Sequence, residues 1–417
     1  MVEYQRSQLG PLLRHAQAQV PFYQSRLDAV LRANGRIDWD RWEDIPIISR
    51  RDLVDNYAEI QARKVPPSHG KGWMMESSGS TGQPVRVTYN DLFASTNRPF
   101  NGRVDKWHDL DWSQMLVTRG KEVSLDEYPD GASAGIWGPP WERSAQAGRQ
   151  VELGRKTPPE QLLKYFQKHR PAYITCGPNA FHMLTLEARR LGLNIHFRAA
   201  FSHGERVTDE AALMARRTFG TPLFERYSSR EAGRMAHQCP HQNGLHVNAE
   251  KVLVEIVDEN GRACPPGVSG RVVVTPFYNT ASPLIRYEQG DIAVFGTAPC
   301  TCGRTLPIMA SVLGRMSAIF RHPSGAVQHR YYPEVAREKL RCSLWQIAQV
   351  GSLDFEVRYV PVDWDVPADE AAAADIFRET YFADARVKFV RTRVLRATPA
   401  DKYLEYVYEV RSPAASA

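Results

Sequence analysis

A segment rich in hydroxyl residues and glycine is the first candidate for chemistry. Residues 76–90 read ESSGSTGQPVRVTYN, in which four hydroxyl side chains and two glycines precede a run that predicts a strand. Glycine lets the backbone approach an anion closely, and Ser and Thr donate hydrogen bonds to phosphate oxygens. A Ser/Gly turn without a ligand is the alternative. The segment is not the nucleotide loop of the P-loop NTPases, which ends in Gly-Lys-Ser/Thr. The expected phosphate contacts are Ser77, Ser78, Gly79, Ser80, Thr81 and Gly82.

Three thiols and one imidazole form a second candidate site. Cys239 and His246 are separated by six residues, and Cys300 and Cys302 by one. Three cysteines and a histidine are the ligands of closed, tetrahedral structural zinc sites. Four unrelated residues, two of them buried free thiols, are the alternative, and His237 and His241 are competing ligands.

Isolated charged residues complete the set. Glu231 is a candidate oxygen ligand for Mg²⁺, a hard cation. Asp291, after Gly290, is a candidate acceptor for ribose hydroxyl groups, with a turn-forming aspartate as the alternative. Lys402 is a flexible cation that could stabilise a developing oxyanion, although a lysine near a C-terminus is most often solvated.

The central elements predict an α/β core with parallel strands. A helix over TPPEQLLKYFQKHR, capped by Thr157 and with proline in its first turn, precedes a buried strand at AYITCG. The helix EAALMARRTFG then leads into PLFERYSS. Repeated helix-then-strand order is typical of parallel sheets. Between about Val252 and Phe295, short β-branched runs separated by Gly, Pro and Asn predict a β-rich subdomain.

The two ends of the chain predict different structure. Two helices are expected from Gln8 to Ala33, and Ser49 is expected to cap a further helix. From about Leu313 onward we expect a turn at HPSGA, a helix near PEVAREKL, strands at WQIAQV and FEVRYV, and a helix near ADIFRETYF. The predicted domains are residues 1–314 and a C-terminal α+β domain of residues 315–417.

Composition narrows the function classes. The chain has 417 residues, is 43% hydrophobic and 24% charged, and carries a formal net charge of +6 without a basic block. It therefore predicts a globular protein that binds no nucleic acid. Without a signal segment or a long apolar stretch, we expect a cytoplasmic protein that does not enter a membrane. Six cysteines in so long a chain argue against a disulfide scaffold.

Five segments, in order, resemble motifs of the adenylate-forming superfamily. SSGSTGQP resembles its phosphate loop, Tyr227-Ser228-Ser229-Arg230-Glu231 its Tyr-Gly-x-x-Glu segment, and IRYEQGD its Tyr-x-x-Gly-Asp segment. LGRMSAIF resembles its hinge, and TPADKYLEYV the segment with its catalytic lysine. Over essentially the whole chain the likeness is greatest to the phenylacetate-CoA ligase family, in its CapK-like or deazaflavin-coenzyme synthetase-like branch.

This resemblance implies roles for individual residues. Lys402 and Glu231 would be catalytic, with Glu231 on Mg²⁺ and Lys402 at the α-phosphate. Asp291 would bind ribose, and Tyr227 would stack near adenine. The resemblance also supports the zinc site. Further contacts to the nucleotide are expected from Ser228, Ser229, Glu205, Arg304 and Arg315.

The resemblance further implies a mobile C-terminal domain and a reaction. ATP and Mg²⁺ would convert a small carboxylic acid, expected to be aromatic, into an acyl-AMP with release of pyrophosphate. The acyl group would pass to coenzyme A, an amine, a hydroxyl or a carrier protein, in a monomer or homodimer. Alternatives are an adenylyltransferase that leaves AMP on its substrate and a nucleotide-binding homologue without turnover. Candidate acyl contacts, for each of which core packing is the alternative, are Trp137, Phe181, Phe201 and His203.

The chain departs from the family pattern at several positions. Gln83 replaces a lysine of the phosphate loop, and Ser228 replaces a glycine. Ser317 stands where the hinge aspartate is usual, and RHPSGAVQHRYYP replaces a glycine-rich loop. The departures concentrate after the hinge, so the sequence predicts adenylation more firmly than the identity of the acyl acceptor.

Overall fold

The computed structural model divides the chain into two compact units. The first comprises the described residues up to Leu313, and the second begins at Gly314. The structure describes residues 1–32, 34–76, 85–138, 147–204, 206–315, 320–324, 327–328, 334–393, 395 and 406–410.

One sheet of the first unit has six strands, of which all but β4 run parallel. Its strand order is β4-β5-β3-β6-β7-β8, and β4 pairs antiparallel with β5. Helices α4, α5 and α6 follow β5, β6 and β7, so the predicted alternation of helix and strand is confirmed. The bounds are β3 Leu116–Lys121, β4 Ala132–Ile136, β5 Arg149–Gly154, α4 Pro159–His169, β6 Tyr173–Cys176, α5 Pro178–Arg190, β7 Ala199–Ser202, α6 Asp209–Phe219 and β8 Leu223–Phe224.

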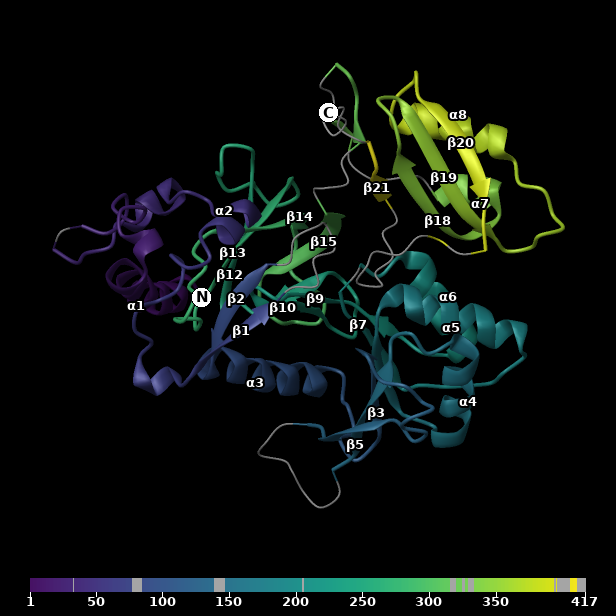
Figure 1. Ribbon diagram of the computed structural model, residues 1–417, viewed down its shortest axis with the longest axis horizontal. Helices are drawn as coiled ribbons and strands as arrows, with labels where there is room; N and C mark the ends of the chain where they lie inside the picture. The colour runs from purple at the N-terminus through teal and green to yellow at the C-terminus, as the bar shows by residue number, and fades with distance from the viewer. Residues whose placement is uncertain are drawn as a thin grey trace, which may run out of the picture. The chain divides into compact units, whose positions relative to one another are not determined.

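The two faces of this sheet bury different side chains because successive residues of a strand point to opposite sides. Ile174 and Cys176 of β6 pack in a hydrophobic cluster with residues of α4, α5 and α6. Figure 1 shows these three helices next to one another. Tyr173 of β6 and Phe201 of β7 belong to a separate cluster on the other face. Pro159 lies in the first turn of α4 as predicted, but Thr157 is not the cap, because Pro158 occupies that position and the helix has no side-chain cap.

The second large sheet is antiparallel and has seven strands in the order β12-β13-β14-β15-β11-β10-β9. It contains the predicted β-rich region and extends beyond it on both sides in the sequence. Figure 1 shows helix α3 running along this sheet below β10. The bounds are β9 Arg226–Ser229, β10 Gly233–Gln238, β11 Leu245–Val247, β12 Val252–Val257, β13 Ser269–Pro276, β14 Tyr287–Phe295 and β15 Ile308–Arg315.

The N-terminal region contains one helix fewer than predicted. Helix α1 spans Val2–Gln19, and a 3-10 helix at Pro21–Tyr23 and turns follow it where a second helix was expected. Pro21 cannot donate the backbone hydrogen bond that would continue α1, so the chain turns there. Ser49 caps α2 (Arg50–Asp55) as predicted, through a capping box with Asp52. The other elements are 3-10 helices Trp39–Asp44 and Pro67–His69, β1 Gly72–Glu76, β2 Arg86–Asn90 and α3 Asp91–Trp107.

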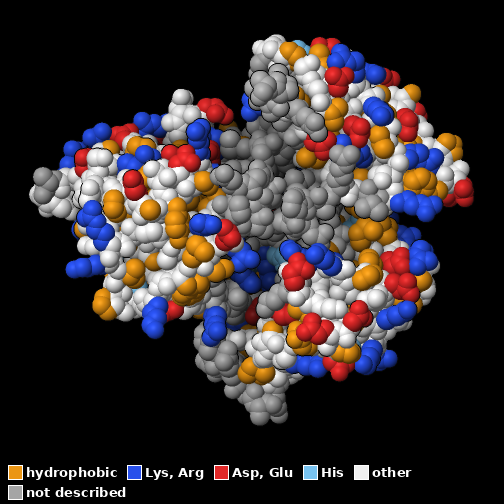
Figure 2. All heavy atoms as spheres, viewed as in Figure 1, with side chains coloured by type: hydrophobic (Ala, Val, Ile, Leu, Met, Phe, Trp, Pro, Cys, Tyr) orange, Lys and Arg blue, Asp and Glu red, His pale blue; other side chains and the backbone are white. Residues whose placement is uncertain are grey.

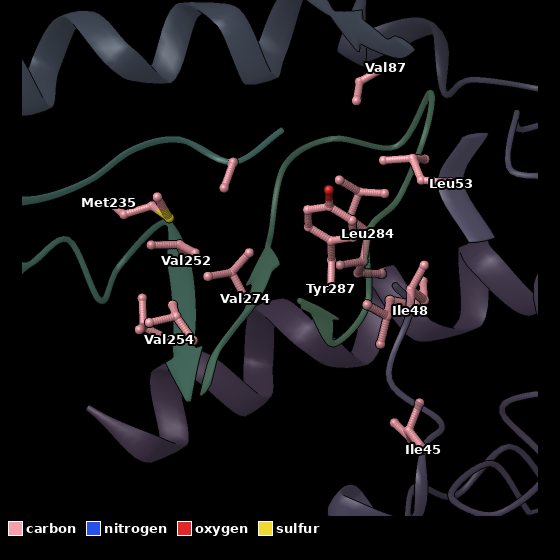
Figure 3. Close-up of a cluster of buried hydrophobic side chains, with 14 of the residues drawn as sticks. Ile45, Ile48, Leu53, Val87, Met235, Val252, Val254, Val274, Leu284 and Tyr287 are labelled. Carbon is pink, nitrogen blue, oxygen red and sulfur yellow. The ribbon is translucent and has the colours of Figure 1, made fainter. Parts of the chain in front are cut away.

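Apolar side chains join the N-terminal region to the antiparallel sheet. Ile45, Ile48 and Leu53 pack in one cluster with Val274 and Tyr287 (Figure 3). Complete burial of such a side chain stabilises the fold by about 1.5–3 kcal/mol. This cluster therefore fixes the strand that carries Asp291.

The described residues of the second unit form a four-stranded sheet, β20-β19-β18-β21, a two-stranded sheet, β16-β17, and two helices. The predicted helices and strands of this region are present, whereas β20 and β21 were not predicted. Its core contains Phe320, Trp345, Phe355 and Phe377. The bounds are β16 Phe320–Arg321, β17 Val327–Gln328, α7 Glu334–Leu340, β18 Cys342–Gln349, β19 Asp354–Pro361, α8 Glu370–Thr380, β20 Arg386–Arg391 and β21 Tyr406–Tyr408.

The six cysteines, all within the described residues, are free thiols. No helix in the described ranges is long and apolar enough to cross a membrane.

Candidate active site

A tight hairpin positions four of the residues singled out in the sequence. Strand β9 carries Tyr227, Ser228 and Ser229, and a three-residue turn containing Glu231 leads into β10. The backbone N–H of Ala232 donates to Ser229 Oγ over 3.0 Å, which holds the turn. The hairpin thus fixes all four residues relative to one another.

Tyr227 and Asp291 come together although 64 residues separate them. The Tyr227 hydroxyl group donates a hydrogen bond of 2.7 Å to Asp291 Oδ2. Three strands lie between β9 and β14, so a flat sheet would hold these two strands roughly 19 Å apart. The sheet must therefore curl to bring Tyr227 and Asp291 together. Two of the five motifs consequently form one local site.

Gly290 determines how Asp291 is presented. The pairing of β13 with β14 is interrupted between Arg271 and Val273, opposite Gly290. Gly290 has a φ of +73°, in the left-handed region that glycine adopts without steric cost. Irregularities of this kind re-aim side chains, and Asp291 follows directly.

Glu231 is a buried carboxylate, with 7% of its surface exposed. Tyr89 of β2 lies next to this turn, and its hydroxyl group donates to the backbone carbonyl of Arg230. Burial raises the pKa of Tyr89 to about 12, and the negative charge of Glu231 contributes in the same direction. A buried carboxylate is stable when it binds a cation, which agrees with the expected role of Glu231 as a ligand of Mg²⁺.

Several expected nucleotide contacts lie outside the described residues. These are the phosphate loop from Ser77 to Gly82, Glu205, and the catalytic candidate Lys402. Arg315 ends β15, but its side chain is also outside the description. The roles of these residues stay predictions.

The expected acyl contacts divide between the two faces of the parallel sheet. Trp137 and Phe201 belong to the same buried cluster. His203 lies just after β7, and its Nε2 is 3.1 Å from the backbone carbonyl oxygen of Arg119. Phe181 is fully buried on the opposite face, between Phe197 and Phe219. Phe181, which lies in α5, therefore packs in the hydrophobic core of this face, as the alternative interpretation predicted.

The four expected zinc ligands converge. Their ligand atoms all lie within 4.8 Å of one another. Cys239 Sγ is 3.7 Å from Cys300 Sγ, and Cys302 Sγ is 3.3 Å from His246 Nε2. Two thiolates on a tetrahedral Zn²⁺ are about 3.8 Å apart, so the spacing and the donor chemistry fit zinc.

Three neighbouring strands bring this cluster together. Cys239 follows β10, His246 lies in β11, and Cys300 and Cys302 precede β15. The competing histidines are elsewhere: His241 contacts Thr301 over 3.0 Å at the surface, and His237 is buried without a thiol partner among the described residues. The structure thus selects His246.

Arg304 lies beside this thiol cluster. Its guanidinium group is 4.7 Å from the centre of the Trp107 ring, and Trp107 packs edge-on against His246. Arg304 therefore lies beside the expected zinc ligands, and its expected role at the nucleotide stays a prediction.

Sequence reasoning missed a group of buried and partly buried charged side chains in and beside the hairpin. It consists of Asp105 on α3, Arg226, Arg234 and Lys251. The polar residues Asn97, Asn101 and Asp105 recur every four positions in α3, which puts them on one side of the helix. This spacing could have indicated that polar or charged partners lie on that side.

A comparison with known proteins finds a relative of this chain. The chain is 27% identical over 334 residues to phenylacetate-coenzyme A ligase from Thermus thermophilus, a match covering 75% of this chain and 69% of the relative. No family model matches the chain.

Solved structures share the fold. One is 2-hydroxyisobutyryl-CoA ligase in its postadenylation state with an acyl-AMP, at a TM-score of 0.77 and 16% identity over 98% of this chain and 89% of that one. Another is an amide bond synthetase from Marinactinospora thermotolerans, at a TM-score of 0.56 and 17% identity over 79% of this chain and 67% of that one. With its ordered motifs and its curated relative, the chain is similar to the phenylacetate-CoA ligases of the adenylate-forming superfamily.

Proposed function

We propose that this chain uses ATP and Mg²⁺ to convert a small carboxylic acid into an acyl-AMP and then transfers the acyl group to a nucleophile. The observation that carries the proposal is the hydrogen bond between Tyr227 and Asp291. It brings together two motifs that in this superfamily serve the nucleotide. The buried Glu231 belongs to the same hairpin as Tyr227.

In the proposed reaction, a carboxylate oxygen of the acid attacks the α-phosphorus of ATP, and pyrophosphate leaves. Asp291 accepts hydrogen bonds from the ribose hydroxyl groups, and Tyr227 orients Asp291. Lys402 stabilises the negative charge that develops at the α-phosphate, where a fixed cation is most effective in a site shielded from water. Glu231 would hold Mg²⁺, which supplies positive charge to the phosphates.

The acid is proposed to be aromatic, and the acceptor to be coenzyme A, an amine, a hydroxyl or a carrier protein. Coenzyme A and an amine are supported by the relatives, because a CoA ligase and an amide bond synthetase are among them. The zinc cluster is proposed to be structural, because its four ligands come from the protein and leave no open position for substrate.

A screen for pyrophosphate release tests this function. Aryl, alkyl and amino acids are offered singly with ATP and Mg²⁺, and release is compared between wild type and Lys402→Ala. We expect release with a subset of acids and a loss of roughly 100-fold or more in Lys402→Ala. Lys388→Ala is the matched control, because this exposed lysine of β20 belongs to the same unit.

The products discriminate the alternatives. Free AMP after addition of an acceptor indicates acyl transfer, whereas AMP retained in the product indicates an adenylyltransferase. ATP binding without release for any acid indicates a homologue without turnover. In that last case the proposed activity is wrong.

A further inference from the structure

The hydroxyl group of Tyr89 joins two parts of the proposed nucleotide site. Strands β1 and β2 pair antiparallel, and the expected phosphate loop, Ser77 to Gly82, connects them in the sequence. Tyr89 lies on β2, and its hydroxyl group donates to the backbone carbonyl of Arg230, the residue before Glu231. One hydrogen bond therefore links the hairpin of the expected phosphate loop to the turn that carries Glu231.

The ring of Tyr89 is held between two aromatic side chains. It packs edge-on against Phe93 of α3 at 4.7 Å between ring centres, and lies 6.2 Å from the ring of Trp73 on β1. Trp73 is at the surface, and Figure 2 shows hydrophobic side chains where β1 lies in Figure 1. Tyr89 itself is only 8% exposed. Its hydroxyl group is thus presented from a ring that has little freedom to move.

The end of β2 is fixed as well. Asn90, the next residue, is fully buried, and its Oδ1 accepts a hydrogen bond from the backbone N–H of Phe93, at the start of α3. Its Nδ2 donates to Thr280 Oγ1 over 2.7 Å, in the segment between β13 and β14. Strand β2 therefore holds Tyr89 at a defined place relative to the antiparallel sheet.

Helix α3 also confines the exit of the Glu231 turn. Gly233, the first residue of β10, has a φ of +69°, and a Cβ there would lie 3.1 Å from Asn97 Oδ1 and 3.5 Å from Phe93 Cζ. Phe93 thus packs close both to Tyr89 and to the residue two positions after Glu231. The turn is held at its entry by the Tyr89 hydroxyl group and at its exit by α3.

Tyr89 remains a hydrogen-bond donor at any physiological pH. Burial raises the pKa of its hydroxyl group to about 12, and the negative charge of Glu231 acts in the same direction. The hydroxyl group therefore keeps its proton. The influence of Glu231 also means that its carboxylate lies near the Tyr89 hydroxyl group.

We propose that Tyr89 is a positioning residue that fixes Glu231 relative to the phosphate loop, so that one Mg²⁺ ion can contact both the carboxylate and the phosphates of ATP. The inference rests on the proposed function, in which Glu231 holds Mg²⁺. Groups that orient a metal ligand contribute to metal affinity, and their loss typically costs about 10- to 100-fold. Mg²⁺ bridges the outer phosphates of ATP, which AMP lacks, so the role of Tyr89 concerns ATP and not AMP.

Nucleotide binding tests the proposal without any turnover. Tyr89→Phe removes the hydroxyl group and keeps the ring that packs against Phe93. Calorimetric titration with ATP and Mg²⁺ should show roughly 10-fold weaker binding than in the wild type, whereas the affinity for AMP should stay that of the wild type. Tyr227→Phe should behave differently: it acts through Asp291 at the ribose, so it should weaken ATP and AMP alike.

The Mg²⁺ requirement is a second measurement. In Tyr89→Phe, the Mg²⁺ concentration that gives half-maximal pyrophosphate release should rise roughly 10-fold, with an unchanged KM for the acid. Tyr57→Phe is the matched control and should behave as the wild type. Its hydroxyl group lies 3.1 Å from Thr88 Oγ1, also on β2 but not at the Glu231 turn.

Three results would overturn the inference. One is equal weakening of ATP and AMP binding in Tyr89→Phe, and another is a Mg²⁺ requirement equal to that of the wild type. The third is a lower melting temperature of Tyr89→Phe with unchanged affinities, which would make the hydroxyl group purely structural.

Failure of the proposed activity would look different. A wild type that binds ATP with Mg²⁺ in a manner dependent on Tyr89, but releases no pyrophosphate with any acid, would support the inference and contradict the activity. A wild type that binds no ATP would contradict both.

Discussion

The hydroxyl group of Tyr227 and the carboxylate of Asp291 show how much of this site depends on single side chains. Each lies on a different strand, and the 2.7 Å bond between them fixes the orientation of the carboxylate before ATP arrives. A preoriented acceptor binds its ligand with a smaller loss of conformational freedom. Asp291, as oriented by Tyr227, is therefore expected to contribute to nucleotide affinity.

Tyr227→Phe should weaken ATP binding roughly 10-fold, because a hydrogen bond to a charged group contributes about 1.5–3 kcal/mol. Calorimetric titration with ATP measures this change. Tyr165→Phe is the control, because it removes a comparable hydroxyl group that donates to the backbone carbonyl of Asp130 and does not belong to the proposed nucleotide site. Equal affinities of Tyr227→Phe and the control would contradict the role assigned to Tyr227.

Lys251 predicts a dependence of stability on pH. Its pKa is about 7 in the folded protein against 10.5 as the ordinary value, because burial and Arg234 disfavour the charged form. Between these values the unfolded chain binds more protons, so the free energy of unfolding rises with pH. Below pH 7 the amine is charged in both states, and the cost of burying it is present in full.

Denaturation of wild type and Lys251→Met at several pH values tests this. From pH 7 to pH 9 the wild type should gain on the order of 2 kcal/mol more than the variant. Lys164→Met, which changes an exposed lysine paired with Glu160, should keep the slope of the wild type. Parallel curves for wild type and Lys251→Met would show that Lys251 does not titrate in this range.

At the scale of elements, the short helix α2 supports the strand that carries Asp291. Ser49 and Asp52 form a capping box at its N-terminus, in which each side chain accepts a hydrogen bond from the backbone N–H group of the other residue. The preceding residue, Ile48, forms a bridge with Tyr287 at the beginning of β14. A helix of 6 residues has little stability of its own, so its cap and its packing decide whether it forms.

Ser49→Ala should lower the free energy of unfolding by about 1 kcal/mol, because the first backbone N–H groups of α2 lose their acceptor. Urea denaturation measures the difference. Ser95→Ala is the control, because the Ser95 hydroxyl group lies within α3 and donates only to the Leu92 carbonyl. A result for Ser49→Ala no larger than the control would mean that α2 is held by packing alone.

At the scale of the whole molecule, distant segments converge at polar centres. Arg286 is fully buried and donates to the backbone carbonyls of Glu43, Ile45 and Gly261. It thereby ties the N-terminal region to the antiparallel sheet. The thiol cluster acts similarly on the segments around β10, β11 and β15, and a metal there would contribute directly to folding.

We expect about one zinc ion per purified chain, in keeping with one four-ligand cluster. The double variant Cys300→Ser, Cys302→Ser should lose the metal and melt at a lower temperature, measured by elemental analysis and calorimetry. Cys264→Ser is the matched control, because Cys264 lies outside the cluster. A metal-free wild type that melts at the same temperature as the metal-loaded protein would contradict the structural role.

The local features of this protein could be predicted from neighbouring residues alone. Ser49 forms its capping box from residues 3 apart, and the buried strand at Tyr173–Cys176 follows from four consecutive residues. The order of the superfamily motifs is likewise a property of the sequence. Such features depend on neighbours along the chain, so they can be read without knowing the fold.

Which distant residues meet became clear from the three-dimensional fold. It placed Phe181 and Phe201 on opposite faces of one sheet, joined Tyr227 to Asp291 through the curl of another, and chose His246 over His237 and His241. It also revealed that the polar side of α3 faces Arg234 and Lys251. These contacts depend on strand pairing and sheet curvature across long sequence separations, and no local pattern encodes them.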